Sequence, residues 1–272
     1  MTQQTDLGNT AHWTAAVRAR ERARADRLVD DPWAEALAGE VGAKWLADHP
    51  EQTTVPIIIR TRFFDEFLER ASTEVQQVVL LGAGLDTRAY RLRWPPGTTV
   101  YELEQPQVLH HKDEVLQAAG AEPSCSRRAV AADLTEPWEE LLIGSGFDRE
   151  LPSAWLLEGF LFYLSGTHVL DLIDRVGALA APRSLMGFDI INGAMLTSEW
   201  TRAWIEMQAR SGAPWIGTMD DPEQTLAERG WRATLTQAGA PDAHHGRWEL
   251  PVLPVKAPGV PHNWFVVAEK IT

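Results

Sequence analysis

A short apolar run that ends in glycine, Val78 to Leu81 followed by Gly82-Ala83-Gly84, constrains the fold more than any other part of the sequence. Four consecutive apolar residues are typical of a parallel strand buried on both faces, because a strand with one face in water would alternate. Glycine after such a strand permits a tight turn and lets the backbone approach a ligand without a Cβ in the way. The run therefore predicts a parallel strand with a binding loop at its carboxyl end.

Six further segments have the composition of strands, and helical stretches separate most of them. They are residues 98–103, 128–132, 154–157, 185–191, 231–236 and 263–268. Strands that alternate with helices form βαβ units with right-handed crossovers, which place helices on both faces of the sheet. The sequence therefore predicts a doubly wound, Rossmann-like α/β fold with a mainly parallel, seven-stranded sheet.

The length of 272 residues suits one α/β domain with helical additions. Helical patterns are expected at residues 15–28, after Asp31-Pro32, at 57–70 behind Pro56, and at 194–210, where Trp200 and Trp204 stand one turn apart. The expected parts are a helical extension (1–72), a cofactor-binding core (73–192), a helical insertion or lid (193–230) and C-terminal strands (231–272).

The formal charge of −13 argues against nucleic acid and anionic lipid surfaces as partners, because the long-range field repels phosphate groups. No apolar run approaches the roughly 20 residues that span a bilayer, and residues 1–10 are polar without a signal-peptide core. We therefore expect a cytoplasmic protein. Cys125 is the only cysteine, which excludes an internal disulfide and any metal site built from cysteines.

The glycine loop differs from the dinucleotide-binding fingerprint at its third glycine, where Thr87 stands. That glycine lets helix and strand pack closely behind a bound pyrophosphate, so its absence disfavours NAD and FAD. A cofactor without phosphates, such as S-adenosylmethionine, still needs the close backbone approach. By itself the loop is equally compatible with a structural turn, since Gly-x-Gly is common by chance.

Acidic residues follow the next predicted strands, at the sheet edge where ligands of such folds bind. Glu104 can accept two hydrogen bonds from ribose hydroxyls, whereas Glu102, inside the strand, is better explained as a packed residue. Asp133-Leu134 offers an acceptor for an adenine amino group beside an apolar contact, or alternatively caps a helix. Glu158 ends an apolar strand, where an unpaired carboxylate would be costly, and can hold a cationic amino group.

Arg60 lies upstream on a predicted helix and can offer a planar fork to a carboxylate. A surface arginine is the alternative.

Several segments resemble the leucine carboxyl methyltransferase family, in the broad sense that includes bacterial polyketide O-methyltransferases. They are Arg60 to Asp65, Leu81 to Leu92, Tyr101 to Pro106, Ala132 to Leu134 and Glu158 to Ser165. The Gly-x-Gly-Leu-Asp-Thr-Arg run is the most specific of them. The N-terminal segments Ala19 to Glu21 and Leu28 to Glu35 also look like bacterial relatives.

The resemblance implies S-adenosyl-L-methionine as cofactor and S-adenosyl-L-homocysteine as product. It also implies a role for each matching residue. Arg60 would bind the cofactor carboxylate, Gly82 with Gly84 and Asp86 would form the cofactor loop, Glu104 would bind the ribose, Asp133 and Leu134 the adenine, and Glu158 the amino group. The family usually has Asp where Glu104 stands, so the ribose geometry should differ in detail.

The acceptor is expected to be a small molecule or a peptide terminus. In-line methyl transfer needs the acceptor oxygen about 3 Å from the methyl carbon. We favour a carboxylate, which is ionised at pH 7 and needs no general base, because no persuasive base stands out. Asp86, Arg88 and Tyr163 are candidates to line the acceptor side, although Arg88 is equally suited to anchor the loop through an ion pair.

Two alternatives stay open. One is O-methylation of a phenolic hydroxyl on a polyketide-like aromatic, for which 12 tryptophans and a lid bearing Trp200, Trp204 and Trp215 are suited. The other is a cofactor-binding protein without methyl-transfer activity. No metal is expected, because the adjacent pairs His110-His111 and His244-His245 lack metal-ligand spacing and are better explained as solvent-facing.

Overall fold

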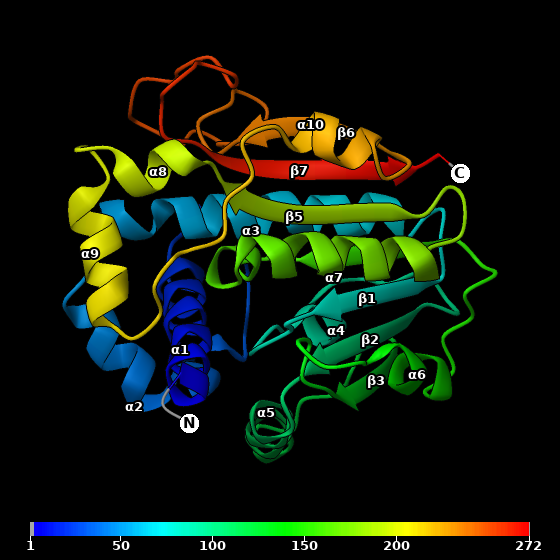
Figure 1. Ribbon diagram of the computed structural model, residues 1–272. Helices are drawn as coiled ribbons and strands as arrows, with labels where there is room; N and C mark the ends of the chain where they lie inside the picture. Colours follow the sequence, from blue (N-terminus) through cyan, green and yellow to red (C-terminus); the bar gives the residue numbers. More distant parts are fainter. Residues whose placement is uncertain (1–2, 272) are drawn as a thin grey trace.

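The computed structural model describes residues 3–271, and a seven-stranded sheet runs through it (Figure 1). The strand order is β3-β2-β1-β4-β5-β7-β6. The strands are β1 (Gln77–Leu81), β2 (Thr99–Glu104), β3 (Ser126–Ala131), β4 (Ser153–Leu157), β5 (Leu185–Ile191), β6 (Trp231–Gln237) and β7 (Asn263–Lys270). β1 to β5 are mutually parallel, and β7 is antiparallel to both β5 and β6. The predicted mainly parallel α/β sheet is confirmed.

Helices cover both faces of the sheet, as βαβ connections require. The helices are α1 (Gln3–Arg22), α2 (Ala34–Ala47), α3 (Glu51–Ala71), α4 (Arg88–Arg91), α5 (Pro106–Ala118), α6 (Glu139–Gly144), α7 (Gly166–Leu179), α8 (Gly193–Thr197), α9 (Arg202–Arg210) and α10 (Pro222–Ala227), with the 3₁₀ helix η1 (Leu161–Tyr163). No helix among residues 3–271 is long and apolar enough to cross a membrane.

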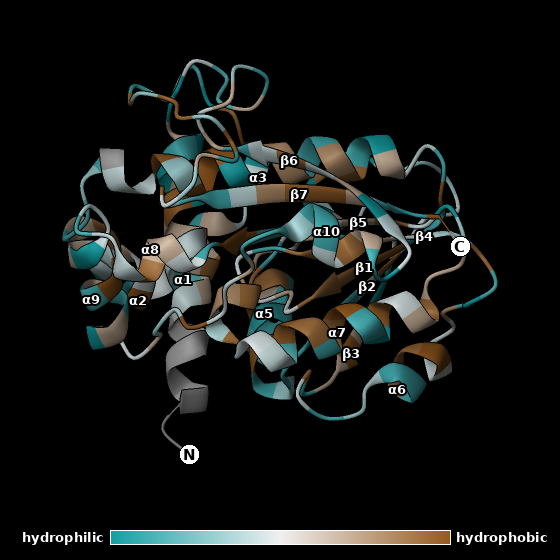
Figure 2. Cartoon of the chain, turned by 45° about the horizontal axis from the view of Figure 1, so that its top comes forward, coloured by the Kyte–Doolittle hydropathy of each residue, from teal (hydrophilic) through white to brown (hydrophobic). Residues whose placement is uncertain are grey.

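The apolar run in β1 is buried on both faces, which explains why it does not alternate. Val78 and Leu80 join an apolar cluster with the side chains of α3, while Val79 and Leu81 join the larger cluster that includes α7. Figure 2 shows hydrophobic residues gathered in the central strands. The glycine loop therefore extends from a strand that is buried on both faces.

The N-terminal helices differ from the predicted ones at their ends. α1 stops at Arg22 instead of reaching Leu28, and α3 begins at Glu51 instead of after Pro56. Proline inside a helix removes one backbone hydrogen bond. The helix nevertheless continues through Pro56, with Thr54 and Ile58 on either side of it both buried.

The single helix predicted over residues 194–210 is wrong, because two helices, α8 and α9, occupy this segment. The Asn192 side chain caps α8 by accepting a hydrogen bond from the N–H of Met195 at 3.2 Å. Ser198 then adopts an extended backbone, and its hydroxyl accepts a hydrogen bond from the N–H of Trp200. Such local side-chain bonds compete with a continuous helix. Trp200 therefore precedes α9 and stands outside any helix.

The N-terminal helices and the insertion gather at one end of the sheet. Both views place α1, α2, α8 and α9 at the carboxyl ends of the parallel strands (Figures 1 and 2). α1 packs against α2, and together with α5 they form a third apolar cluster that includes Leu85 of the glycine loop. This arrangement roofs the sheet edge at which ligands of such folds bind.

Candidate functional site

Four neighbouring strands end at the same cavity, which has a volume of about 790 Å³. Its lining includes residues 82–86 after β1, Glu104 at the end of β2, Asp133 after β3 and Glu158 after β4. Because parallel strands bring their carboxyl ends to one edge, residues far apart in the sequence meet here. All the residues predicted to form a cofactor site line this one cavity.

Both glycines of the loop are required by its backbone. Gly82 and Gly84 have positive φ angles of 66° and 46°. A Cβ on Gly82 would lie 3.1 Å from the ring of Phe160. The N–H groups of Gly82 and Ala83 donate to the carbonyl of Leu103 at 3.0 and 3.1 Å, so the turn is fixed to the end of β2. The loop presents bare backbone to the cavity, as the sequence predicted.

The Glu104 carboxylate is held by the backbone around it. Its two oxygens accept hydrogen bonds from the N–H of Gly84 at 2.8 Å and of Gln105 at 2.7 Å. Burial raises the pKa of Glu104. Each oxygen keeps a further lone pair for a ligand. Glu102 is different, because it is fully buried and paired with Lys112 at 2.8 Å, as expected for a packed strand residue.

Asp133 forms a turn and does not cap a helix. One carboxylate oxygen, Oδ1, accepts hydrogen bonds from the N–H and the hydroxyl of Thr135 at 3.0 and 2.7 Å. Helix α6 starts only at Glu139. The turn leaves Oδ2 without a hydrogen bond from the part of the chain that the structure describes. The neighbouring Leu134 packs on the apolar cluster beneath the cavity and lines its wall.

Arg60 joins two carboxylates, Glu158 just after the end of β4 and Asp189 inside β5. Its Nε donates to Glu158 at 3.0 Å, and its Nη1 donates to Asp189 at 3.1 Å. Asp189 is fully buried and also accepts a hydrogen bond from the N–H of Gly159 at 2.6 Å. Burial raises the pKa of Asp189. Asp189 was not predicted as a site residue, although a lone carboxylate in an apolar strand is the same signal that identified Glu158.

Arg88 is a buried anchor of the glycine loop. Its guanidinium is only 2% exposed and donates to Asp65 at 2.7 Å, to the carbonyl of Thr61 at 3.2 Å, and to Asp86. Its Nη2 lies 2.6 Å from Oε2 of Glu158, but off the line of a hydrogen bond. These contacts correspond to the loop-anchoring role that the sequence left open. An acceptor-lining role for Arg88 stays a prediction.

The N-terminal extension supports the loop from outside. Arg18 of α1 donates to the carbonyl of Leu85 at 2.7 Å and to Asp31 at 2.8 Å. The same Asp31 oxygen accepts from the hydroxyl of Thr87 at 2.6 Å. Asp31 is fully buried, and its side-chain partners Arg18 and Thr87 come from other segments of the chain. The only sequence signal for this contact was the likeness of residues 28–35 to bacterial relatives.

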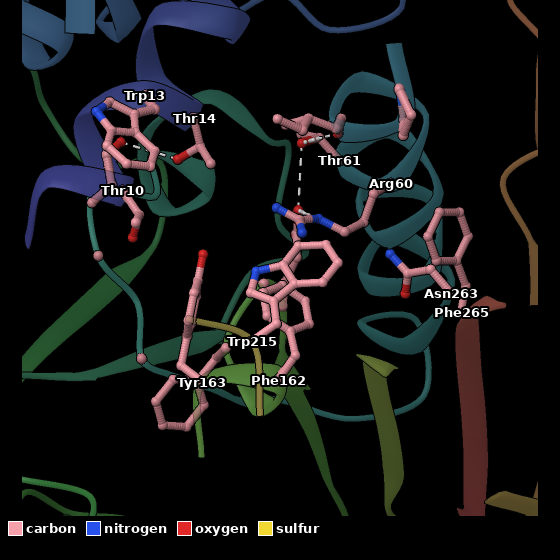
Figure 3. Close-up of a pocket in the computed structure, with 18 of the residues that line it drawn as sticks. Thr10, Trp13, Thr14, Arg60, Thr61, Phe162, Tyr163, Trp215, Asn263 and Phe265 are labelled. Carbon is pink, nitrogen blue, oxygen red and sulfur yellow. Dashed lines mark hydrogen bonds and ion pairs between the residues drawn. The ribbon is translucent and has the colours of Figure 1, made fainter. Parts of the chain in front are cut away.

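Tyr163 stands on the wall opposite α1. Burial raises the pKa of the Tyr163 hydroxyl. A phenol with a raised pKa is a poor general base. Figure 3 shows Tyr163 with Trp215 and Phe162 on one side of the cavity, facing Trp13 and Thr10 and lying beside Arg60.

The histidine pairs lie away from this cavity. None of His110, His111, His244 and His245 lines it. His110 and His245 are exposed, as expected, whereas His111 and His244 are half-buried. Within residues 3–271, no group of three or more His, Cys, Asp or Glu side chains is arranged to hold a metal ion.

Comparison with known families fits this geometry. The family model for leucine carboxyl methyltransferase matches residues 11–177. That range contains the glycine loop and the ends of β1 to β4. The chain belongs to the leucine carboxyl methyltransferase family. The resemblance stated from the sequence motifs is therefore confirmed.

Relatives within the family match most of the chain. A protein of Saccharopolyspora erythraea is 41% identical over 253 residues, which is 86% of each chain. One of Mycobacterium tuberculosis is 40% identical over 260 residues, or 85% of each chain. Both carry the provisional name S-adenosyl-L-methionine-dependent methyltransferase.

Solved structures share the fold of this family member. A protein of Thermobifida fusca, provisionally described as a methyltransferase, superposes with a TM-score of 0.61 at 18% identity and covers 86% of this chain and 89% of its own. A protein of Streptomyces avermitilis gives a TM-score of 0.59 at 16% identity, with 94% and 96% covered. At such identities the likeness bears on the fold alone.

Proposed function

We propose that this member of the leucine carboxyl methyltransferase family binds S-adenosyl-L-methionine in the cavity at the carboxyl ends of β1 to β4 and transfers its methyl group to an oxygen atom of a small molecule or peptide. The observation that carries the proposal is the convergence of the glycine loop, Glu104, Asp133 and Glu158 on one cavity. When bound, the cofactor supplies an electrophilic methyl group on a sulfonium.

The lining fits the parts of this cofactor. The remaining lone pairs of Glu104 suit the two ribose hydroxyls, and Oδ2 of Asp133 suits the adenine amino group beside Leu134. Glu158 can hold the ammonium group. The hydrogen bonds to Glu158 and Asp189 use Nε and Nη1 of Arg60. Its Nη2 can therefore donate to the cofactor carboxylate. Asp86 shapes the loop through Arg88 and would contribute negative charge to the lining around a bound sulfonium.

Calorimetry tests the cofactor assignment. The wild-type protein should bind S-adenosyl-L-methionine or S-adenosyl-L-homocysteine in the micromolar range. Asp133→Ala should weaken binding by about tenfold through the loss of a hydrogen bond to a ligand. Gly82→Val should abolish it, because a side chain there meets Phe160 and the cavity. Tight binding of NADH with none of either adenosyl compound would overturn the assignment.

Two acceptor classes follow from the chemistry of the site. A carboxylate of a small molecule or peptide terminus needs no general base, and a buried Tyr163 with a raised pKa supplies none. A phenolic hydroxyl is the second candidate, favoured by the aromatic side chains around the cavity. Methylation of both classes with cofactor carrying a labelled methyl group, followed by base hydrolysis, separates them, because only methyl esters release labelled methanol.

A further inference from the structure

The cavity has one charged half and one uncharged half. Every Asp, Glu, Lys or Arg that lines it belongs to the glycine loop, to a strand end beside that loop, or to the helices that hold the loop. These residues are Arg18, Arg60, Asp86, Arg88, Arg91, Glu104, Asp133 and Glu158. They leave a second region, above η1 and between the N-terminal helices and the insertion, that the cofactor assignment does not use.

The second region is lined by aromatic, aliphatic and neutral polar side chains. We call it the aromatic chamber, and its defining residues are Trp13, Trp45, Phe162, Tyr163, Trp204 and Trp215. Among the described residues that line this part of the cavity, none is an aspartate, glutamate, lysine or arginine. An aromatic wall of this kind buries flat apolar ligands well and anions poorly.

Two groups of aromatic rings form the walls of the aromatic chamber, one stacked and one in tilted and edge-to-face contact. On the side of the N-terminal helices, Trp13 and Trp45 are stacked with ring centroids 5.1 Å apart and planes 8° from parallel. On the side of η1 and the insertion, Trp215 lies 4.3 Å from Phe162 and 5.8 Å from Trp204 between ring centroids. Figure 3 shows Trp13 on one side and Trp215 with Phe162 on the other. The two groups of rings bound the space with ring faces and edges.

The titratable groups on this part of the wall do not supply a charge at neutral pH. Burial raises the pKa of Tyr163 and lowers that of His262. Both side chains are therefore uncharged near pH 7. The nearest guanidinium, Arg60, pairs with Glu158 and Asp189, and the proposed function uses its remaining Nη2 for the cofactor carboxylate, so Arg60 has no donor left for an acceptor anion.

The mouth of the cavity is also apolar. Trp200 is 77% exposed and Leu250 is 65% exposed, and the neighbouring Val252 and Leu253 are exposed as well. All four line the cavity. Apolar side chains at the entrance of an apolar chamber are typical of a binding site whose ligand removes them from water.

We propose that the aromatic chamber is the acceptor subsite, and that it takes a neutral, flat, apolar molecule bearing a hydroxyl group while discriminating against carboxylates. The inference rests on the proposed function and selects between its two acceptor classes. In the reaction the hydroxyl oxygen forms a bond to the methyl carbon as the sulfur–methyl bond breaks. The hydroxyl proton passes to water, and the sulfonium becomes a neutral thioether.

A matched pair of probes tests the subsite by binding alone. At pH 7, 2-naphthol is neutral and 2-naphthoate is an anion, and both carry the same ring system. We expect protein saturated with S-adenosyl-L-homocysteine to bind 2-naphthol at least tenfold more tightly than 2-naphthoate, measured by calorimetry and by quenching of tryptophan fluorescence. Equal or tighter binding of 2-naphthoate, or binding of neither probe, would contradict the inference.

A charge introduced into the aromatic chamber supplies the converse test. Trp204→Arg should weaken the binding of 2-naphthol and strengthen the binding of 2-naphthoate, each by about tenfold, because the aromatic chamber then holds a cation. Trp204→Phe keeps an uncharged ring, and Val41→Arg adds the same charge at an exposed position outside the cavity, so both should keep the wild-type preference. An unchanged preference in Trp204→Arg would count against the subsite.

Binding of S-adenosyl-L-homocysteine is measured first in every variant. If the wild-type protein does not bind S-adenosyl-L-homocysteine, the proposed function is wrong. If it binds S-adenosyl-L-homocysteine but prefers 2-naphthoate, only the acceptor inference is wrong. Retention of cofactor affinity in Trp204→Arg also shows that the variant is folded.

Discussion

At the scale of single residues, the site is dominated by buried charges that share partners. Arg60 forms ion pairs with Glu158 and Asp189. Arg88 forms ion pairs with Asp65, Asp86 and Glu158. A buried ion is tolerated only when its hydrogen bonds are satisfied, so the geometry of each member depends on the others. A small displacement of one guanidinium should therefore lower both the affinity for the cofactor and the stability of the protein.

Gly159 tests this dependence. A Cβ at this position would lie 2.8 Å from Nη2 of Arg60, and the backbone φ angle of 68° disfavours any side chain. Gly159→Ala should displace the guanidinium and raise the dissociation constant of S-adenosyl-L-homocysteine about tenfold, with a stability loss of about 1–2 kcal/mol. Gly166→Ala is the control, because a Cβ there meets nothing within 4 Å. Calorimetry and urea unfolding of both variants provide the measurement.

Asp86 makes stability depend on acid pH. Burial alone would raise the pKa of Asp86, but the charges of Arg88 and neighbouring cations lower it to about 2. Because the folded pKa lies below the unfolded value near 4, ionised Asp86 contributes stability above pH 4, and this contribution is lost as the pH falls toward 2. The difference in the free energy of unfolding between wild type and Asp86→Asn should therefore decrease by about 2 kcal/mol as the pH falls from 4 to 2.

Urea unfolding at several pH values measures this difference, with the exposed Asp242→Asn as control. A constant gap between wild type and Asp86→Asn from pH 5 to pH 2 would show that the carboxylate is not held ionised by its neighbours.

At the scale of elements, the N-terminal helices help to hold the glycine loop in place. α1 packs along α2, and its Arg18 reaches the carbonyl of Leu85. The close approach of the two helices depends on Gly42, where a Cβ would lie 2.4 Å from the carbonyl oxygen of His12. A change at the helix contact should therefore reach the binding site through Arg18.

Gly42→Ala measures that coupling. Alanine normally stabilises a helix by about 1 kcal/mol relative to glycine, but here overpacking should reverse the sign and cost about 1–3 kcal/mol. The affinity for S-adenosyl-L-homocysteine should fall together with stability. Gly144→Ala, in another helix and with no heavy atom within 4 Å of the added Cβ, should leave that affinity unchanged. A destabilised Gly42→Ala protein that keeps full affinity for S-adenosyl-L-homocysteine would show that the packing of α1 does not influence the glycine loop.

The elements that the sequence predicted well are those set by local pattern. β1 was recognisable from its apolar run, and its observed start at Gln77 differs from the prediction by one residue. Glu104 and Asp133 were predicted to lie near each other, and both line the cavity, because a parallel sheet brings the carboxyl ends of its strands together. The break at Ser198 follows from local side-chain hydrogen bonds that compete with a helix and that periodicity does not reveal. The buried role of Asp31 depends on Arg18 and Thr87, which are distant in the sequence, so composition and periodicity do not encode it.

At the scale of the whole molecule, the cavity is complete only when distant parts of the chain are folded together. α1 and α2 contribute one wall, the parallel strands contribute the floor, and α9 with the segment after it contributes the opposite wall. The insertion is joined to the N-terminal helices by contacts such as Nε2 of His49 with Sδ of Met207 at 3.1 Å. This arrangement predicts that the sheet and its helical additions unfold as one unit.

Thermal unfolding with and without ligand tests that prediction. With S-adenosyl-L-homocysteine at 100 times its dissociation constant, binding to the folded state should stabilise the protein by about 2.7 kcal/mol and raise Tm by roughly 5–10 °C. The whole transition should shift as a single step in calorimetry, because every wall of the cavity belongs to the same cooperative unit. Two transitions, of which ligand moves only one, would instead show that the helical additions fold separately from the sheet. In that case Gly42→Ala should lower the temperature of the unshifted step alone.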